Sequence, residues 1–222
     1  MSQTFINGAK YSFSTTLAQA VAISLISNAN PAVATAATLP NEGDIVLLQS
    51  DWTDLNDQAT FADNVGGGVF ELAQIDTSDP ALFPVGESAG SYRVAAGFVS
   101  LSQIRSIDQS GGDTNNFTWG YIDDRSPRQR SKPTDQNPLV LTVMMDYDPD
   151  LPWDAALQAV SKSRQLVTMK ERLPTGDVLV YTGYMSYQKS PSRTRNENMT
   201  VTMTMSVNSE ILRFPAAFFA GS

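Results

Sequence analysis

Apolar and hydroxyl-bearing side chains alternate without a break from Met199 to Val207. The even positions of this segment are filled by Thr200, Thr202, Thr204 and Ser206. A period of two predicts a β-strand with one dry face and one polar face. The polar face carries no charge, although strands that face bulk water normally carry Lys or Glu as protection against edge pairing. A hydroxyl-only face is typical of a smooth wall or of a surface covered by another chain.

The same pattern analysis predicts a mainly β chain. Strands are expected at residues 11–16, 20–27, 33–37, 45–48, 69–75, 117–122, 139–146, 165–170 and 178–187, with one or two more within 92–107. Polar or glycine-rich composition predicts loops at residues 51–68, 77–90 and 108–116. Gly183 predicts a bulge or bend in its strand.

One α-helix is predicted at about residues 152–164. A single apolar stripe at helical spacing is formed by Trp153, Ala156, Leu157 and Val160. Asp150 is the expected N-cap, and Pro152 suits the first turn. The spacing of Asp146, Asp148 and Asp150 resembles the start of a calcium loop, but the glycine and glutamate that such a loop needs are missing, so capping is the better interpretation.

The length of 222 residues fits a single domain spanning 1–222. Residues 20–90 are a candidate β-rich sub-module within it. Residues 123–138 form the most polar segment and contain three prolines, which predicts a long extended loop or an extended hairpin. The apolar segment Phe214–Phe219 is expected either to dock on its own domain or to meet a neighbour.

The composition excludes several classes of function. The chain has no Cys and no His, which removes thiolate nucleophiles, His-based acid–base catalysis and the usual zinc ligands. No paired carboxylates stand out, so we expect no enzyme, no cofactor and no metal. The longest apolar stretch, Leu17–Ile26, is too short to span a bilayer, and the first residues lack a signal-peptide pattern. We therefore expect no membrane insertion and a cytoplasmic location before assembly.

Charge is distributed unevenly along the chain. Residues 1–124 hold 3 basic and 14 acidic residues, and residues 125–222 hold 12 basic and 9 acidic residues. The acidic half would repel a nucleic-acid backbone. In repeated copies, the two halves of the chain could attract each other.

Two groups of basic residues are candidates for assembly contacts. The first consists of Arg125, Arg128, Arg130 and Lys132. This cluster lacks interleaved aromatic residues for base stacking, so a solvated loop or a contact with an acidic surface of another subunit is favoured over nucleic-acid binding. The second consists of Arg193 and Arg195, at a solvated hairpin tip or in an inter-subunit ion pair. Thr200, Thr202 and Thr204 complete the set of candidate assembly residues.

Two parts of the chain resemble phage tail proteins. A small β module that recurs in tail proteins of long-tailed bacteriophages is similar to the segments Ala22–Val33, Gly43–Leu48, Asp54–Asn56, Val69–Leu72 and Ile75–Thr77. This sequence departs from the module at Gln58–Gly68, and Leu39-Pro-Asn stands where His-Gly is frequent. The second part, Leu139–Phe214, resembles the later half of the major tail tube proteins of long, non-contractile tails.

The resemblance implies a β-sandwich or barrel-like tail tube fold with one flanking helix. It implies subunits that close into hexameric rings, and rings that stack into a tube through which DNA passes as cargo. Partners would be further copies of the chain and other phage tail proteins, and the final location would be the virion tail. Strands 178–187 and 199–207 would lie near the lumen or the ring interface, while 123–138 would reach a neighbouring ring and 20–90 would form or decorate the ring wall.

Two other functions stay open from the sequence. One is a different tail ring with the same fold, at the tail end or in the baseplate hub. The other is a carbohydrate-binding β-sandwich that uses Trp52 or Trp119, although core or interface packing is the commoner role of tryptophan.

Overall fold

The computed structural model describes residues 6–86, 88–123, 125 and 128–220. This part of the chain is mainly β and contains one α-helix, as predicted, together with two short 3-10 helices. The helices are α1 (Pro152–Ser163), η1 (Thr53–Leu55) and η2 (Ala216–Ala220). The strands are β1 (Lys10–Leu17), β2 (Val21–Ile26), β3 (Ala32–Ala36), β4 (Ile45–Ser50), β5 (Ala59–Gly66), β6 (Val69–Leu72), β7 (Gly90–Leu101), β8 (Ile104–Ser110), β9 (Thr114–Trp119), β10 (Arg130–Gln136), β11 (Leu139–Asp146), β12 (Leu166–Arg172), β13 (Val178–Gln188), β14 (Thr200–Val207) and β15 (Leu212–Phe214).

Strands β2 to β7 form a closed, antiparallel barrel. The pairings run β2-β3-β6-β5-β4-β7, and β7 pairs back with β2. Closure leaves no edge strand in this part of the molecule. Its apolar cluster includes Ile26, Leu48, Phe70 and Tyr92, all almost fully buried.

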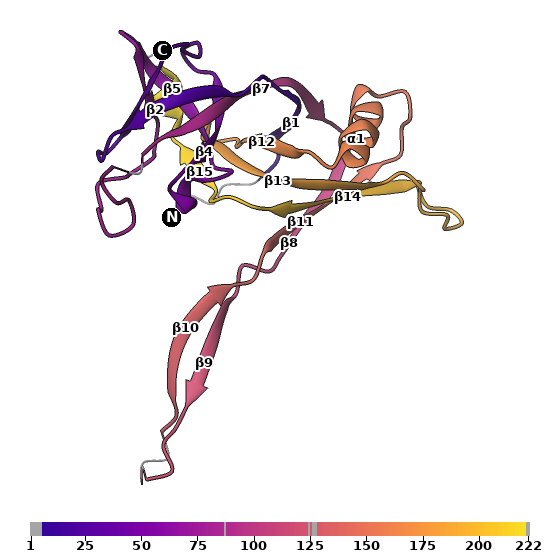
Figure 1. Ribbon diagram of the computed structural model, residues 1–222. Helices are drawn as coiled ribbons and strands as arrows, with labels where there is room; N and C mark the ends of the chain where they lie inside the picture. The colour runs from indigo at the N-terminus through magenta and orange to yellow at the C-terminus, as the bar shows by residue number, and fades with distance from the viewer. Residues whose placement is uncertain (1–5, 87, 124, 126–127, 221–222) are drawn as a thin grey trace.

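Strand β7 also connects the barrel to an open sheet (Figure 1). Its first half pairs with β2 and β4, whereas its second half, from Ala95 to Leu101, pairs with β1. The open sheet continues as β1-β12-β13-β14-β11-β8, and β15 pairs with the beginning of β13. One face of this sheet packs on α1 in a second apolar cluster, to which the sheet contributes Met145, Met203 and Met205 and the helix Trp153, Leu157 and Val160.

Helix α1 is held by the predicted apolar stripe, but the predicted N-cap is wrong. The N-cap position is Leu151, which makes no side-chain capping hydrogen bond. Asp150 lies before it, where its backbone N–H donates to Asp148. Asp148 and Asp150 thus shape the turn that leads into the helix instead of capping the helix itself.

The loop predicted at residues 51–68 is largely wrong. It contains η1 and the whole of β5, whose first four residues are buried. The polar side chains that suggested a loop are satisfied inside the protein: Thr60 donates to the carbonyl of Ala73, and Gln58 donates to the carbonyl of Glu210. Gly67 and Gly68, both with positive φ, form the tight turn from β5 to β6.

Gly183 lies in a regular part of β13 and makes no bulge. It pairs in continuous register with Val167 on one side and Val207 on the other. A Cβ at this position would lie 2.2 Å from the carbonyl oxygen of Ser206. Glycine is therefore needed for a close backbone approach and not for a bend.

The apolar C-terminal segment docks on its own chain. Phe214 is fully buried, and its ring lies 4.8 Å from the ring of Phe61 on β5. Phe218 and Phe219 also contact Phe61, at 5.8 and 5.2 Å between ring centroids. Since β15 belongs to the open sheet and β5 to the barrel, this aromatic cluster joins the two parts.

A hairpin arm of β9 and β10 extends far from the body of the molecule (Figure 1). It continues from β8 and β11, and residues 111–113 separate β8 from β9. Strand β10 takes up residues 130–136 of the segment 123–138 and pairs with β9, so this part of the segment is one strand of a hairpin. The two strands pair with each other and with no other described strand.

No helix in the described part of the chain is long and apolar enough to cross a membrane.

Candidate assembly surfaces

The hydroxyl-bearing side chains of β14 lie on the face of the open sheet opposite α1. Thr200, Thr202 and Thr204 are half-buried there, whereas Val201, Met203 and Met205 are buried on the other face. The neighbouring strands continue the polar surface, because Ser186 of β13 and Thr142 of β11 both pair with Thr204. The resulting surface, here called the hydroxyl face, spans β13, β14, β11 and β8.

Few charged side chains interrupt the hydroxyl face. Asp146 pairs with Thr200 in the ladder, and its carboxylate forms an ion pair with Arg105 at 2.5 Å. Asp108 of β8 pairs with Thr142 and is exposed. The face is therefore mainly neutral and polar with a slight excess of acid, and Met144 and Tyr184 are exposed exceptions with apolar surface.

The outer strand of the open sheet, β8, offers a second candidate surface. It pairs with β11 along one edge, and no described strand pairs with its other edge. Its register with β11 shifts between Met144 and Met145. Such irregularities, known as β-bulges, are common at the edges of sheets. Such an edge can accept a strand from another chain.

The arm brings aromatic and cationic side chains onto one face. Trp119 is the cross-strand partner of Arg130, and Phe117 is the partner of Lys132. The rings of Phe117 and Trp119 stack with centroids 5.9 Å apart, and the Arg130 guanidinium lies 5.5 Å from the ring of Tyr121. We call this surface the aromatic–cationic face.

In the sequence no aromatic residues are interleaved with the basic cluster, but the fold places two of them opposite Arg130 and Lys132. Trp119 and Phe117 lie on β9, 11 and 15 positions before the cations with which they pair, and hairpin pairing brings them opposite those cations. Arg125 and Arg128 are exposed in the connection between the two strands. The four basic residues thus share the outer part of the arm.

The second basic pair lies elsewhere. Arg193 and Arg195 are exposed in the connection between β13 and β14. This connection adjoins Thr200, which pairs with Asp146, whereas the arm leaves the opposite end of β11 at Leu139. The structure therefore does not bring the two basic groups together.

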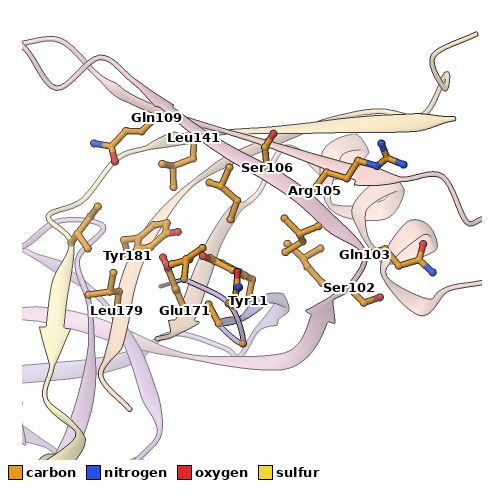
Figure 2. A pocket seen from close by; sticks show the side chains of 18 residues that line it. Tyr11, Ser102, Gln103, Arg105, Ser106, Gln109, Leu141, Glu171, Leu179 and Tyr181 are labelled. Carbon is orange, nitrogen blue, oxygen red and sulfur yellow. The ribbon is translucent and has the colours of Figure 1, made fainter. Parts of the chain in front are cut away.

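A half-open groove of about 700 Å³ lies between β1, β12 and β13 on one side and β8 and β11 on the other (Figure 2). The side chains of Tyr11, Glu171 and Tyr181 point into it (Figure 2). Burial raises the pKa of the Glu171 carboxyl, and a hydrogen bond from the Tyr11 hydroxyl partly offsets this effect. Burial and the nearby Glu171 carboxylate raise the pKa of both tyrosines.

The described lining of the groove does not match the carboxylate pair of the common glycosidases. Glu171 is the single carboxylate among the described residues that line it, whereas glycosidases of the common type use two. Across the described residues, no cluster of three or more Asp or Glu side chains could hold a metal ion. The groove was not visible from the sequence, because its residues come from six separate strands, β1, β7, β8, β11, β12 and β13.

Tryptophan does not form an exposed sugar site on the body of the protein. Trp52 and Trp153 are buried, with 3% and 1% of their surface exposed. Trp52 donates from its indole nitrogen to the carbonyl of Pro84, and its ring packs on Phe83. This corrects the alternative that used Trp52 for carbohydrate binding, and leaves only Trp119 on the arm.

Comparison with known proteins supplies the decisive observation. A family model described as phage tail tube protein, TTP, matches residues 50–216. The chain belongs to the phage tail tube protein family. The match starts at the last residue of β4 and ends in η2. It includes α1, the arm, every strand of the open sheet except β1, and strands β5, β6 and β7 of the barrel. A search of curated proteins finds no match.

Family membership gives the surfaces described above a context. A tail tube family member has a structural role in the phage virion, in the tail. Such a role depends on contacts with other copies and with other tail proteins. Accordingly, the hydroxyl face, the arm and the edge of β8 are more informative about this chain than the groove.

Proposed function

We propose that this chain forms rings, that the rings stack into the phage tail tube, and that the tube is the conduit for DNA ejection. The observation that carries the proposal is the division of the open sheet into two faces. The apolar face packs on α1, whereas the described side chains of the hydroxyl face stay partly or fully exposed. A sheet of this kind can line a channel while its other face supplies the core.

The hydroxyl face is suited to the lumen. Hydroxyl groups hydrogen-bond water and carry no positive charge that would hold a phosphate backbone, and the exposed Asp108 adds weak repulsion. The whole chain has a net charge of −8, which opposes adhesion of passing DNA. In this proposal β13 and β14 line the channel, with Thr200, Thr202 and Thr204 at its surface.

The edge of β8 would then contact the next subunit of the same ring. Ring closure by such head-to-tail contacts is heterologous, since a different surface is used on each side. A closed ring also removes the exposed edge that a single subunit leaves. The number of subunits follows from the rotation between neighbours, and the family resemblance suggests six.

The arm would join successive rings. It projects beyond the compact body (Figure 1), so it can cross the boundary between two rings. Its basic residues, Arg125, Arg128, Arg130 and Lys132, would face the acidic surface of another copy, while Arg193 and Arg195 would lie at a separate contact. Before assembly, the subunit would reside in the host cytoplasm.

Electron microscopy of the concentrated, purified protein tests the proposal. Rings or tubes are expected, and a sample that stays monomeric at every salt concentration would refute it. The length of the assemblies distinguishes a tube from a tail-end or baseplate ring, which would not elongate.

An arm deletion tests the stacking role. The backbone N–H of Asn137 donates to the carbonyl of Asp113 at 2.9 Å, so replacing residues 114–136 with two glycines closes the hairpin by a short turn. Rings without tubes are the expected result. Thr202→Lys provides the parallel test of the hydroxyl face: an unchanged monomer with altered assembly is expected, since Thr202 is half-exposed on a sheet surface.

A further inference from the structure

The aromatic–cationic face of the arm has the composition of a protein interface. Phe117 is 62% exposed, although it lies on a regular strand. Aromatic residues and arginine are the types that dominate binding at protein interfaces. A two-stranded hairpin has no hydrophobic core of its own. Its apolar side chains therefore contribute little to stability until another surface buries them.

A loop on the barrel has the complementary composition. Residues 76–86, here called the acidic loop, expose Leu82 and Val85 to 58% and 80%. Asp76 and Asp79 lie at its start. Hydrogen bonds from Ser78 and Asn30 lower the pKa of the Asp76 carboxyl, so that it stays ionised.

The acidic loop is firmly held in spite of its irregular backbone. The side chain of Asn28 donates to the carbonyls of Thr77 and Phe83, at 3.1 and 2.8 Å. Thr77 and Phe83 are buried, and the Trp52 indole donates to the carbonyl of Pro84 at 3.0 Å. Leu82 and Val85 are therefore presented outward by a fixed support, not by a segment that could fold them inward.

Charge complementarity identifies a second copy of the chain as the occupant. The barrel segment 21–94 contains ten acidic residues and one basic residue, Arg93. The Arg93 guanidinium donates hydrogen bonds to the carbonyls of Leu17 and Ala18. An acidic surface with exposed aliphatic side chains matches a cationic surface with exposed aromatic ones.

The contact must form between copies. The arm of each subunit runs away from its own body, while the acidic loop lies on the barrel (Figure 1). When two different surfaces meet and the rotation between neighbouring subunits does not close a ring, each added copy leaves a free surface for the next one. This property suits growth along a tube axis.

We propose that the aromatic–cationic face of the arm docks on the acidic loop of a subunit in the neighbouring ring. The proposal rests on the stacked-ring function proposed above and names the surfaces that meet. Phe117 and Trp119 would cover Leu82 and Val85, and Lys132 would lie near Asp79.

Photo-crosslinking tests this docking directly. A benzophenone amino acid replaces Phe117 and keeps an aromatic ring on the docking face, and the same replacement at Thr118, on the opposite face of the hairpin, is the control. Assembled tubes are irradiated, and the crosslinked peptide is identified by mass spectrometry. The expected product joins position 117 to residues 76–86 of another copy, with a much weaker product from position 118.

The outcomes separate this inference from the function on which it rests. Crosslinks to another segment, or tubes that give no crosslink, would overturn the docking site but leave the tube intact. The absence of any ring or tube would instead refute the proposed function. A crosslink to an added single-stranded oligonucleotide, in place of protein, would show that the arm binds nucleic acid and would also overturn the inference.

A second measurement uses exposed side chains, so folding is not at risk. The double variant Leu82→Ser, Val85→Ser is expected to raise the protein concentration needed for tube growth by about tenfold or more. Leu25→Ser is the matched control, because Leu25 is 52% exposed on β2 of the same barrel. Equal effects of the two variants would contradict a specific role of the acidic loop.

Discussion

The aromatic cluster around Phe214 is expected to hold the barrel against the open sheet. Phe214 has no exposed surface, and its ring lies 4.8 Å from Phe61 and 5.4 Å from Phe218. On β15 it pairs with Val178 of β13. Phe214→Ala therefore removes a buried ring that contacts both parts of the molecule.

The size of the effect follows from the burial. Truncation of a fully buried Phe to Ala costs about 3–5 kcal/mol of unfolding free energy, and the lost edge-to-face contacts are part of this cost. For a domain of this size, each kcal/mol lowers the melting temperature by about 2–4 °C. A decrease of about 6–20 °C is expected, and Phe214→Leu, which retains most of the volume, should cost about 1.5 kcal/mol or less.

Thermal and denaturant unfolding of the dilute, unassembled protein measure this difference. Phe117→Ala is the control, because Phe117 is exposed on the arm and should change stability by only about 0.5 kcal/mol. The reasoning would be refuted if Phe214→Ala cost under about 1 kcal/mol, or if both variants cost the same.

Two further predictions concern Gly183 and Glu171. Gly183→Ala should lower the free energy of unfolding by about 1–3 kcal/mol or more, because the new methyl group would lie 2.2 Å from the carbonyl oxygen of Ser206. Gly66→Ala is the control: its methyl group would meet no atom within 4 Å, so it should be nearly neutral in the same unfolding assay. Burial raises the pKa of Glu171 in the folded state above its value in the unfolded state. The protonated carboxyl therefore contributes fully to the free energy of unfolding below the unfolded-state pKa, and this contribution is lost as the pH rises through the folded-state pKa. Glu171→Gln should therefore be at least as stable as the native chain at pH 7 and lose this advantage near pH 4; a difference in unfolding free energy that does not change with pH would contradict this explanation.

The sequence pattern was sufficient to predict those strands and the helix that bury one face and expose the other. The alternation in Met199–Val207 correctly predicted β14 and its two faces, because successive side chains of a strand point to opposite sides. Strand β11 was predicted at its exact bounds. The apolar stripe of α1 was equally clear, since a helix at the surface of a core needs one dry side.

Pattern failed where polar residues are satisfied by distant partners. The beginning of β5 looked like a loop because Gln58 and Thr60 are polar, yet their hydrogen bonds run to Glu210 and Ala73. The N-cap of α1 was misplaced for a related reason, as Asp150 and Asp148 bond within the preceding turn. No local rule reveals which distant carbonyl a buried side chain will reach.

The candidate surfaces divide in the same way. The sequence by itself determined the hydroxyl face, the basic cluster of the arm and the absence of Cys and His, because these depend on residue types and short spacings. Only the tertiary structure decided that Trp119 and Phe117 lie opposite Arg130 and Lys132, and that the barrel closes through β2 and β7. These features depend on pairing between strands that are distant in the chain, and such pairing is selected by the packing of the whole fold.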